Sequence, residues 1–255
     1  MTELDLAAVE RLLRTEEIGC RINYLATTPS TMDVARGEAA NGAPHGAVVI
    51  AEEQTAGRGR FGRRWVSPAG KNLYLTLVLR PAAGRLRALS MMVPLAVCRA
   101  VEAVTPLRPV IKWPNDVLVG ERKLAGVLIE GESSGAELTF ALAGIGINVN
   151  DPIDDAEIAG IATSLLRELG EEVPRERVLA ALLNELADAY YAPPEDVRSG
   201  WRSRIATLGH TVRLTFRDET YEGTAEDVDD EGSLILRLAD GGRRTFEAGE
   251  VTLRR

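Results

Sequence analysis

The stretch RPVIKWPNDVLVGERKLAGVLIEGESSGAELTFALAGIGINV, residues 108–149, contains most of the information on the expected fold. It holds five short apolar runs, at 108–113, 116–119, 123–130, 137–143 and 145–149. Glycine, proline and acidic residues separate these runs, and the gaps between them are short. Runs of this kind are typical of neighbouring antiparallel strands joined by tight turns. The stretch therefore predicts a largely antiparallel sheet.

Both helices and strands are predicted in the sequence around this stretch. In chain order we expect a helix at 4–14, strands at 47–51 and 73–79, a helix at 85–104 and a helix that begins after Pro174. The last helix carries its apolar stripe on Val178, Leu182, Leu186 and Tyr190, and Pro193 with Pro194 ends it. Because helices and strands do not alternate regularly, we expect an α+β fold, in which a mixed, mostly antiparallel sheet is flanked by helices.

The pattern of the sequence changes after about Gly209. Short alternating runs are separated there by glycine and aspartate, which predicts a small β-barrel of about 45 residues. We therefore expect two domains, at 1–207 and 208–255. Residues 218–231, inside the second, carry eight acidic residues and no basic one. This segment fits a solvated acidic face that resists edge-to-edge aggregation, or a surface that docks a partner protein.

Composition excludes several classes of function. The chain has 255 residues and a net charge of −8, so it can bind DNA only through a segregated basic patch. The one such patch, at 54–71, is suited to one small anionic ligand. Two distant cysteines and two histidines argue against a disulfide framework or a zinc site. No apolar run is long enough to span a membrane, and no signal peptide is apparent, so we expect a soluble cytoplasmic protein.

The first motif that could carry chemistry is the hexapeptide GRGRFG at 57–62. Its glycines allow the backbone to approach a ligand closely, and its arginines can donate paired hydrogen bonds to carboxylate or phosphate oxygens. Taken alone, the hexapeptide also fits a flexible, solvated loop. It has neither the spacing of a Walker A loop nor that of a dinucleotide-binding fingerprint.

The placement of the lysines gives a second indication of which residues could carry chemistry. Only three of the thirty basic residues are lysines, namely Lys71, Lys112 and Lys123. A compact ammonium group can approach a phosphoryl or acyl oxygen where a planar guanidinium does not fit, although three lysines could also cluster by chance. Asp116, which follows Lys112 closely, fits either a turn or the positioning of a divalent cation.

Two further motifs have both a local and a functional interpretation. Ser30 or Thr31 can open a helix as its N-cap, and the same hydroxyls can donate to a ligand carbonyl oxygen. Asn148 offers an amide able to read a base edge through two hydrogen bonds. Gly126 lies three residues after Lys123 and leaves room for a close approach beside that lysine.

Taken together and in this order, the motifs resemble the catalytic domain of the biotin–protein ligases, also called biotin–[acetyl-CoA-carboxylase] ligases. The matching stretches are PSTMD (29–33), EQTAGRGRFGRRW (53–65), KWPNDV (112–117), KLAGVLIE (123–130) and GIGINVN (144–150). The resemblance implies a class II synthetase-like fold with a small C-terminal Src-homology-like barrel. About 20 residues precede the catalytic part, so the resemblance is to the short class without an N-terminal DNA-binding domain.

The resemblance implies an ATP-dependent ligase that forms biotinyl-5′-AMP and transfers biotin to a lysine of a biotin carboxyl carrier protein, with Mg²⁺ accompanying ATP. It implies no binding to DNA or to a membrane, and it leaves a homodimer open. A lipoate–protein ligase or another acyl-adenylating transferase of the same fold is the main alternative. A transcriptional regulator that senses biotin without catalysis is another.

The resemblance also assigns roles to individual residues. It implies catalytic roles for Lys123, Arg58 and Arg60. It implies biotin binding by Ser30, Thr31, Met32, Gln54, Arg58, Gly59, Arg60, Trp65, Lys123 and Gly126. It implies ATP binding by Arg58, Arg60, Trp65, Lys112, Asn115, Lys123 and Asn148. Trp65 and Trp113 are expected to form walls of the pocket, Asp116 is the expected metal ligand, and Met32 is expected to act through its backbone or its packing.

Overall fold

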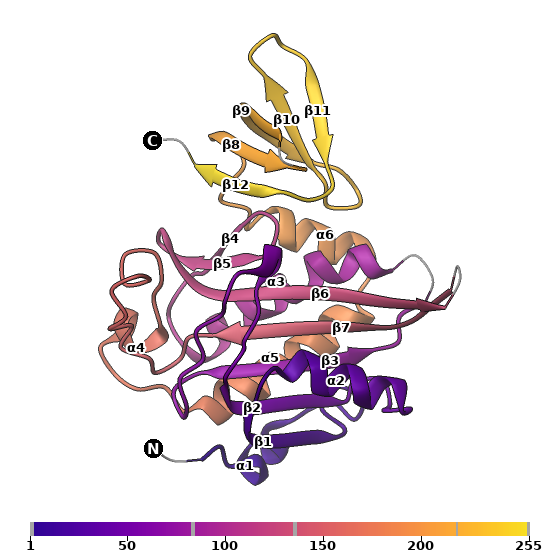
Figure 1. Cartoon of the computed structure of the whole chain (residues 1–255), viewed down its shortest axis with the longest axis vertical. Coiled ribbons are helices and arrows are strands. Elements are labelled where there is room, and N and C mark those ends of the chain that lie inside the picture. The colour runs from indigo at the N-terminus through magenta and orange to yellow at the C-terminus, as the bar shows by residue number, and fades with distance from the viewer. Residues whose placement is uncertain (1–2, 83–84, 135–136, 218, 254–255) are drawn as a thin grey trace.

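The computed structural model describes residues 3–82, 85–134, 137–217 and 219–253, and its centre is a seven-stranded sheet with the order β1-β2-β3-β7-β6-β5-β4 (Figure 1). Its strands are β1 (Ile22–Thr28), β2 (Val48–Gln54), β3 (Leu73–Leu79), β4 (Val110–Lys112), β5 (Asp116–Val119), β6 (Arg122–Ser134) and β7 (Glu137–Ile147). The β1–β2 pair is parallel and the other pairs are antiparallel. The predicted mixed, mostly antiparallel sheet is therefore confirmed.

Helices cover both faces of this sheet. The described helices are α1 (Leu6–Leu12), α2 (Thr31–Ala40), α3 (Leu86–Val104), α4 (Leu165–Leu169), α5 (Arg175–Tyr191) and α6 (Pro194–Arg202). Helix α2 packs on one face of the sheet and α3 on the other, and α5 and α6 pack against α3. Leu75 and Leu77 of β3 belong to the core cluster that includes α3 and α5, whereas Val78 belongs to the cluster that includes α2. Because successive side chains of a strand point to opposite faces, β3 is buried on both sides. None of the described helices combines the length and the hydropathy that crossing a bilayer requires.

Several element boundaries differ from the prediction. The runs predicted as two strands at 137–143 and 145–149 merge into the single strand β7, which ends at Ile147. Pro193 and Pro194 follow the end of α5, as predicted, but Pro194 also lies in the first turn of the unpredicted helix α6. Proline is tolerated there because the first helical N–H groups have no intrahelical partner. Strand β1 and the short helix α4 were also not predicted.

The predicted C-terminal β unit is a five-stranded antiparallel sheet. Its strands β8 (Thr211–Phe216), β9 (Glu219–Val228), β10 (Leu234–Leu238), β11 (Arg243–Phe246) and β12 (Glu250–Leu253) lie in the order β11-β10-β9-β8-β12. We call it the C-terminal sheet. The Trp113 indole, 1% exposed, donates from Nε1 to the Gly232 carbonyl at 2.9 Å. Gly232 also lies against Met91 and Trp201, so both parts of the chain share one packed junction.

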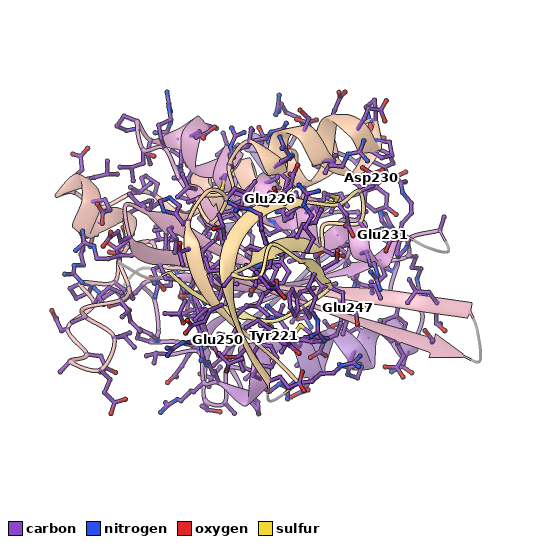
Figure 2. All side chains as sticks on the ribbon, turned by 90° about the horizontal axis from the view of Figure 1, so that it is seen from above. Tyr221, Glu226, Asp230, Glu231, Glu247 and Glu250 are labelled. Carbon is purple, nitrogen blue, oxygen red and sulfur yellow. The ribbon has the colours of Figure 1, made fainter. Side chains whose placement is uncertain are left out.

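The acidic segment of the C-terminal sheet is largely engaged with arginines. The ion pairs to the rest of the molecule are Asp227–Arg202 at 2.7 Å, Asp230–Arg198 at 2.7 Å and Glu231–Arg87 at 2.8 Å. Figure 2 shows Asp230 and Glu231 along one side of the sheet. The predicted solvated face is thus in part an intramolecular contact surface; Asp218, counted in that segment, lies outside the described residues.

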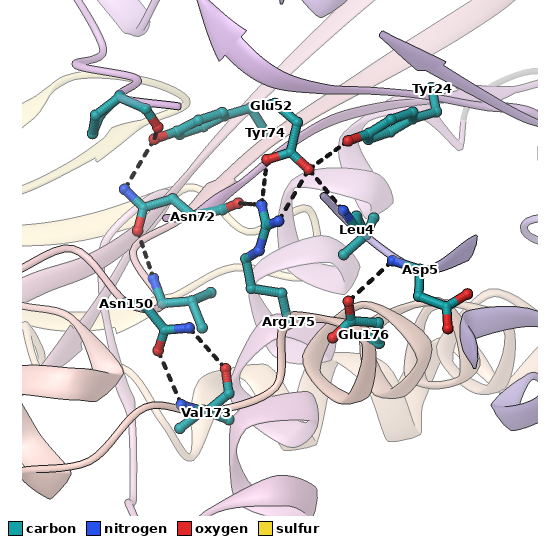
Figure 3. A network of polar contacts seen from close by, with 12 residues as sticks. Leu4, Asp5, Tyr24, Glu52, Asn72, Tyr74, Asn150, Val173, Arg175 and Glu176 are labelled. Carbon is teal, nitrogen blue, oxygen red and sulfur yellow. Dashed lines mark hydrogen bonds and ion pairs between the residues drawn. The ribbon is translucent and has the colours of Figure 1, made fainter. Parts of the chain in front are cut away.

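A buried polar network joins β2 to α5 (Figure 3). The Arg175 guanidinium donates to both carboxylate oxygens of Glu52, at 2.6 and 3.0 Å, and to the Asn72 carbonyl at 3.3 Å. The Tyr24 hydroxyl (2.6 Å) and the Leu4 amide (3.0 Å) donate to the same carboxylate. Burial, followed by the bond to Glu52, raises the pKa of Tyr24 to about 12. Segments distant in sequence are therefore fixed around one carboxylate.

Candidate active site

One cavity of about 910 Å³ lies between the central sheet, the arginine-bearing loop at residues 57–65 (the arginine loop) and a turn of the C-terminal sheet. It brings together all of the predicted site residues, namely Ser30, Thr31, Met32, Gln54, Arg58, Gly59, Arg60, Trp65, Lys112, Asn115, Asp116, Lys123, Gly126 and Asn148. These residues come from five separate segments of the sequence. The fold therefore places every predicted site residue on the same cavity.

The start of α2 forms the hydroxyl-bearing part of the cavity. Ser30 is the N-cap residue, yet its side chain makes no capping bond, which corrects that part of the prediction. Its buried Oγ has no hydrogen-bond partner among the described residues. Thr31 instead contacts Thr76 (Oγ1 to Oγ1, 2.9 Å), and its amide donates to Gln54 Oε1 at 2.9 Å. Because buried polar atoms are normally satisfied, the Ser30 hydroxyl is suited to a ligand.

The arginine loop carries two guanidinium groups with different environments. Arg58 donates two hydrogen bonds to the Asp33 carboxylate, at 2.6 and 3.0 Å, and this pairing raises the pKa of Arg58. Arg60 donates from Nη1 to Asn115 Oδ1 at 3.0 Å and to the Gly249 carbonyl at 3.4 Å. Burial lowers the pKa of Arg60. Arg60 is therefore the more buried cation, and its hydrogen-bond partners are neutral oxygens.

Trp65 ends the arginine loop and lies over glycines of the central sheet. A Cβ on Gly146 would lie 2.5 Å from Trp65 Cε2, and one on Gly126 would lie 2.9 Å from Cζ3, so only glycine leaves room for the indole at these positions. The buried Nε1 of Trp65 has no hydrogen-bond partner among the described residues. Lys123 Nζ lies 5.2 Å from the ring centroid, within the range of a cation–π contact. The ring thus walls the cavity next to the lysine.

Lys123 and Asp116 form an ion pair inside the cavity. Lys123 Nζ lies 2.6 Å from Asp116 Oδ1, and both side chains remain partly exposed. They lie on neighbouring antiparallel strands, Asp116 at the start of β5 and Lys123 near the start of β6. In the described parts of the chain, no three His, Cys, Asp or Glu side chains gather to hold a metal ion. Within those residues Asp116 is therefore not part of such a cluster, and it balances the charge of Lys123.

Three further predicted residues lie at the cavity with their side chains in different surroundings. Asn115 Nδ2 donates to the Val127 carbonyl at 2.8 Å, which orients its Oδ1 toward Arg60. Asn148 Nδ2 donates to the Thr163 carbonyl at 2.9 Å. Trp113, expected as a wall, borders the cavity but is almost wholly buried.

The cavity also includes residues that sequence reasoning did not select. They are Arg63, Arg64, Arg122, Gly249 and Glu250, among others. The first two belong to the arginine loop and could have been found from the loop motif itself. Glu250, which pairs with Arg63, lies 187 residues further along the chain in the C-terminal sheet, and no motif connects the two.

The arrangement concentrates positive charge at one place on an acidic chain. Arg58, Arg60 and Lys123 all border the cavity, and carboxylates balance two of them in this structure. Anionic oxygens of a ligand can replace those carboxylates as hydrogen-bond acceptors. The glycines on β6 and β7 and the indole of Trp65 add apolar walls. The site is suited to a ligand that combines anionic groups with a flat or apolar body.

Comparison with known proteins identifies relatives over both parts of the chain. Residues 24–148 match the Biotin/lipoate A/B protein ligase family, and residues 207–254 match the Biotin protein ligase C terminal domain. The biotin–[acetyl-CoA-carboxylase] ligase of Paracoccus denitrificans is 40% identical over 240 residues, covering 89% of this chain and 98% of that protein. The corresponding ligase of Mycobacterium tuberculosis is 37% identical over 261 residues, covering 95% of this chain and 94% of that protein.

A solved structure also resembles the whole fold. The biotin protein ligase from Aquifex aeolicus, in complex with biotin and ATP, superimposes with a TM-score of 0.79 at 29% sequence identity. The match covers 92% of this chain and 99% of that chain.

Proposed function

Because the chain belongs to the biotin–[acetyl-CoA-carboxylase] ligase family, we propose that it activates biotin with ATP and transfers the biotin to a lysine of a biotin carboxyl carrier protein. The observation that carries this proposal is the convergence of Arg58, Arg60 and Lys123 on one cavity. The same cavity presents the Ser30 hydroxyl, which has no hydrogen-bond partner in the described ranges and is suited to a ligand carbonyl such as the ureido oxygen of biotin.

The first step joins two anions. The carboxylate oxygen of biotin attacks the α-phosphorus of ATP, the bond from that phosphorus to the bridging oxygen of the β-phosphate breaks, and pyrophosphate leaves. At about 4 Å, two unit negative charges repel by about 4 kcal/mol at an effective dielectric of about 20. Arg58, Arg60 and Lys123 offset this repulsion, and they stabilise the charge that spreads over the phosphoryl oxygens in the transition state.

The second step transfers the acyl group. The neutral ε-amine of the acceptor lysine attacks the carbonyl carbon of biotinyl-5′-AMP, AMP leaves with the bridging oxygen, and the nitrogen loses a proton to give the amide. The mixed anhydride is prone to hydrolysis, so a cover that excludes water preserves it. The arginine loop, which borders the cavity and contains Gly57, Gly59 and Gly62, is suited to this role.

Residue roles follow from position in the cavity. We assign the ureido end of biotin to Ser30, Thr31 and Gln54, whose polar atoms surround the start of α2. We assign the nucleotide to Trp65, which offers a flat ring, and Asn148, which offers an amide, both in the cavity lining. Mg²⁺ that arrives with ATP needs only one or two protein carboxylates beside the phosphates, and Asp116 fits that requirement once phosphate oxygens replace it at Lys123.

A lipoate–protein ligase is the competing assignment, since the first family match includes such enzymes. Thermal unfolding with each cofactor separates the two, because the ligand that binds more tightly stabilises the folded state more. We expect biotin to raise the melting temperature more than lipoate does. A larger shift with lipoate would contradict the proposal.

The decisive assay measures pyrophosphate release with ATP in the presence and absence of biotin. We expect release that depends on biotin, followed by biotin transfer to a purified carrier domain. Folded protein that releases no pyrophosphate on addition of biotin would refute the proposed function. We also propose a cytoplasmic location, and no DNA binding because the net charge is −8; salt-sensitive retention on a DNA column would contradict the latter.

A further inference from the structure

A turn of the C-terminal sheet reaches the candidate active site. Gly249 and Glu250, where β11 leads into β12, border the cavity. The Glu250 carboxylate accepts a hydrogen bond from the Arg63 guanidinium, and the Gly249 carbonyl accepts one from Arg60 Nη1 at 3.4 Å. Two arginines of the arginine loop therefore contact the same turn.

The turn itself is firmly held. Val251, next to Glu250, pairs with Leu214 in the ladder between β12 and β8. Glu247, at the other end of the turn, accepts a hydrogen bond from Arg87 of α3 at 2.7 Å. At Gly249 a Cβ would lie 3.1 Å from the Thr215 carbonyl oxygen, so the turn packs closely on β8. The turn can thus act as a fixed support.

The arginine loop is held to the rest of the molecule by its side chains, such as Arg58 and Trp65, while the backbone hydrogen bonds given for residues 57–65 join the loop to itself. Its backbone closes on itself through Gly59 N to the Arg63 carbonyl (2.7 Å) and Trp65 N to the Gly57 carbonyl (2.9 Å). Phe61, at its tip, is 65% exposed and therefore does not anchor the loop in the core. Ordering a glycine-rich segment costs conformational entropy, so side-chain contacts decide how often the loop lies in place.

We propose that Glu250 is a positioning residue for the adenylation reaction: through Arg63 it holds the arginine loop, and Arg60 with it, where the phosphates of ATP bind. The identity of the ligand in this inference rests on the proposed function. Glu250 acts on the nucleotide only through the loop. If Glu250 instead competed with the phosphates of ATP for Arg63, removing its charge would raise the apparent affinity for ATP.

The kinetic test uses Glu250→Gln, which keeps the size of the side chain and removes its charge. Exposed ion pairs contribute modestly, so we expect the KM for ATP to rise about two- to five-fold, with kcat at saturating ATP unchanged. Glu250→Asp, which keeps the charge, should restore part of the affinity. Glu226→Gln is the matched control, because it removes an equal charge and an ion pair, the one with Arg243, from the C-terminal sheet but lies outside the turn and outside the cavity lining.

A second readout follows the loop in the ligand-free protein. Trypsin cleaves after arginine, and the arginine loop contains four of them, Arg58, Arg60, Arg63 and Arg64. We expect Glu250→Gln to be cut in this loop about two to five times faster than the wild type, whereas Glu226→Gln is cut at the wild-type rate. Mass spectrometry of the first fragments identifies the cleavage site.

Equal KM values and equal cleavage rates for the two glutamine variants would overturn the inference. A lower KM for ATP in Glu250→Gln would also overturn it, since this would mean that Glu250 competes with the phosphates. A loss of thermal stability in Glu250→Gln alone, with KM and kcat changing together, would indicate a merely structural role. If the wild type shows no biotin-dependent pyrophosphate release, the proposed function fails, and the cleavage rates alone then decide whether Glu250 holds the loop.

Discussion

Glu52→Gln is expected to destabilise the protein strongly, because it removes the charge of the carboxylate that accepts two hydrogen bonds from the buried Arg175 guanidinium. The two side chains are 10% and 7% exposed, so little water is available to solvate the remaining charge. Removing one partner of a buried ion pair costs about 3–5 kcal/mol. The glutamine oxygen can still accept a hydrogen bond, so we expect about 3 kcal/mol, a large part of the 5–15 kcal/mol typical of folded proteins.

Urea denaturation at pH 7, followed by circular dichroism at 222 nm, measures this loss as a lower free energy of unfolding. Glu53→Gln is the matched control, since the neighbouring carboxylate accepts a long hydrogen bond from the exposed Thr27 hydroxyl, at 3.4 Å, and its replacement should cost less than about 0.5 kcal/mol. Replacing Glu52 and Arg175 together by methionine removes both charges and should cost less than Glu52→Gln alone. A loss below about 1 kcal/mol for Glu52→Gln would refute the reasoning from buried charge.

The same ion pair makes a pH-dependent contribution. Burial acts to raise the pKa of Glu52, but the hydrogen bonds from Arg175 and Tyr24 outweigh it, and the net pKa lies below the ordinary value. The stabilisation is therefore fully present above the pKa of the unfolded chain, about 4.3, and is lost as the pH falls through the lower pKa of the folded state. The difference between wild type and Glu52→Gln should shrink on acidification below pH 4. A difference that stays constant from pH 7 to pH 3 would contradict this assignment.

Three further predictions concern the cavity and the thiols. Lys123→Ala should slow biotin-dependent pyrophosphate release about 100-fold or more without changing the circular dichroism spectrum, and a wild-type rate would exclude the assigned role. Gly146→Ala should displace the Trp65 indole, because the new Cβ would lie 2.5 Å from its Cε2, and calorimetry should show ATP binding at least about five-fold weaker. Only one thiol of the native protein should react with Ellman's reagent at pH 8, because Cys20 is exposed whereas burial raises the pKa of Cys98 to about 12; rapid reaction of both would contradict this.

The central strands could be predicted because they consist mostly of apolar residues, and such a composition indicates burial. Leu73–Leu79 is apolar at nearly every position and buried throughout, and the prediction gave its exact bounds. Ile22–Thr28 was missed because it is an edge strand with exposed positions and therefore has a mixed pattern. The break predicted inside β7 came from Gly144 and Gly146. Those glycines do not end the strand; they leave room for Met32 and Trp65.

The candidate site could be predicted as far as its residues lie in local motifs. The motifs around Arg58 and Lys123 identified residues that the fold then places on one cavity. The contribution of Glu250 depends on how the C-terminal sheet packs on the rest of the molecule, and no local pattern contains that information. The absence of a capping bond from Ser30 could not be predicted either. Serine is preferred at the start of a helix, but this preference does not tell where its hydroxyl points.

The junction between the C-terminal sheet and the helices has an optical consequence. Trp113 and Trp201 are both 1% exposed and meet Gly232 there, while Trp65, the third tryptophan, lies at the cavity. A dry indole emits at shorter wavelength than a wet one, so any loosening of the C-terminal sheet would shift the intrinsic fluorescence to the red. The protein thus carries its own label-free reporter of that junction.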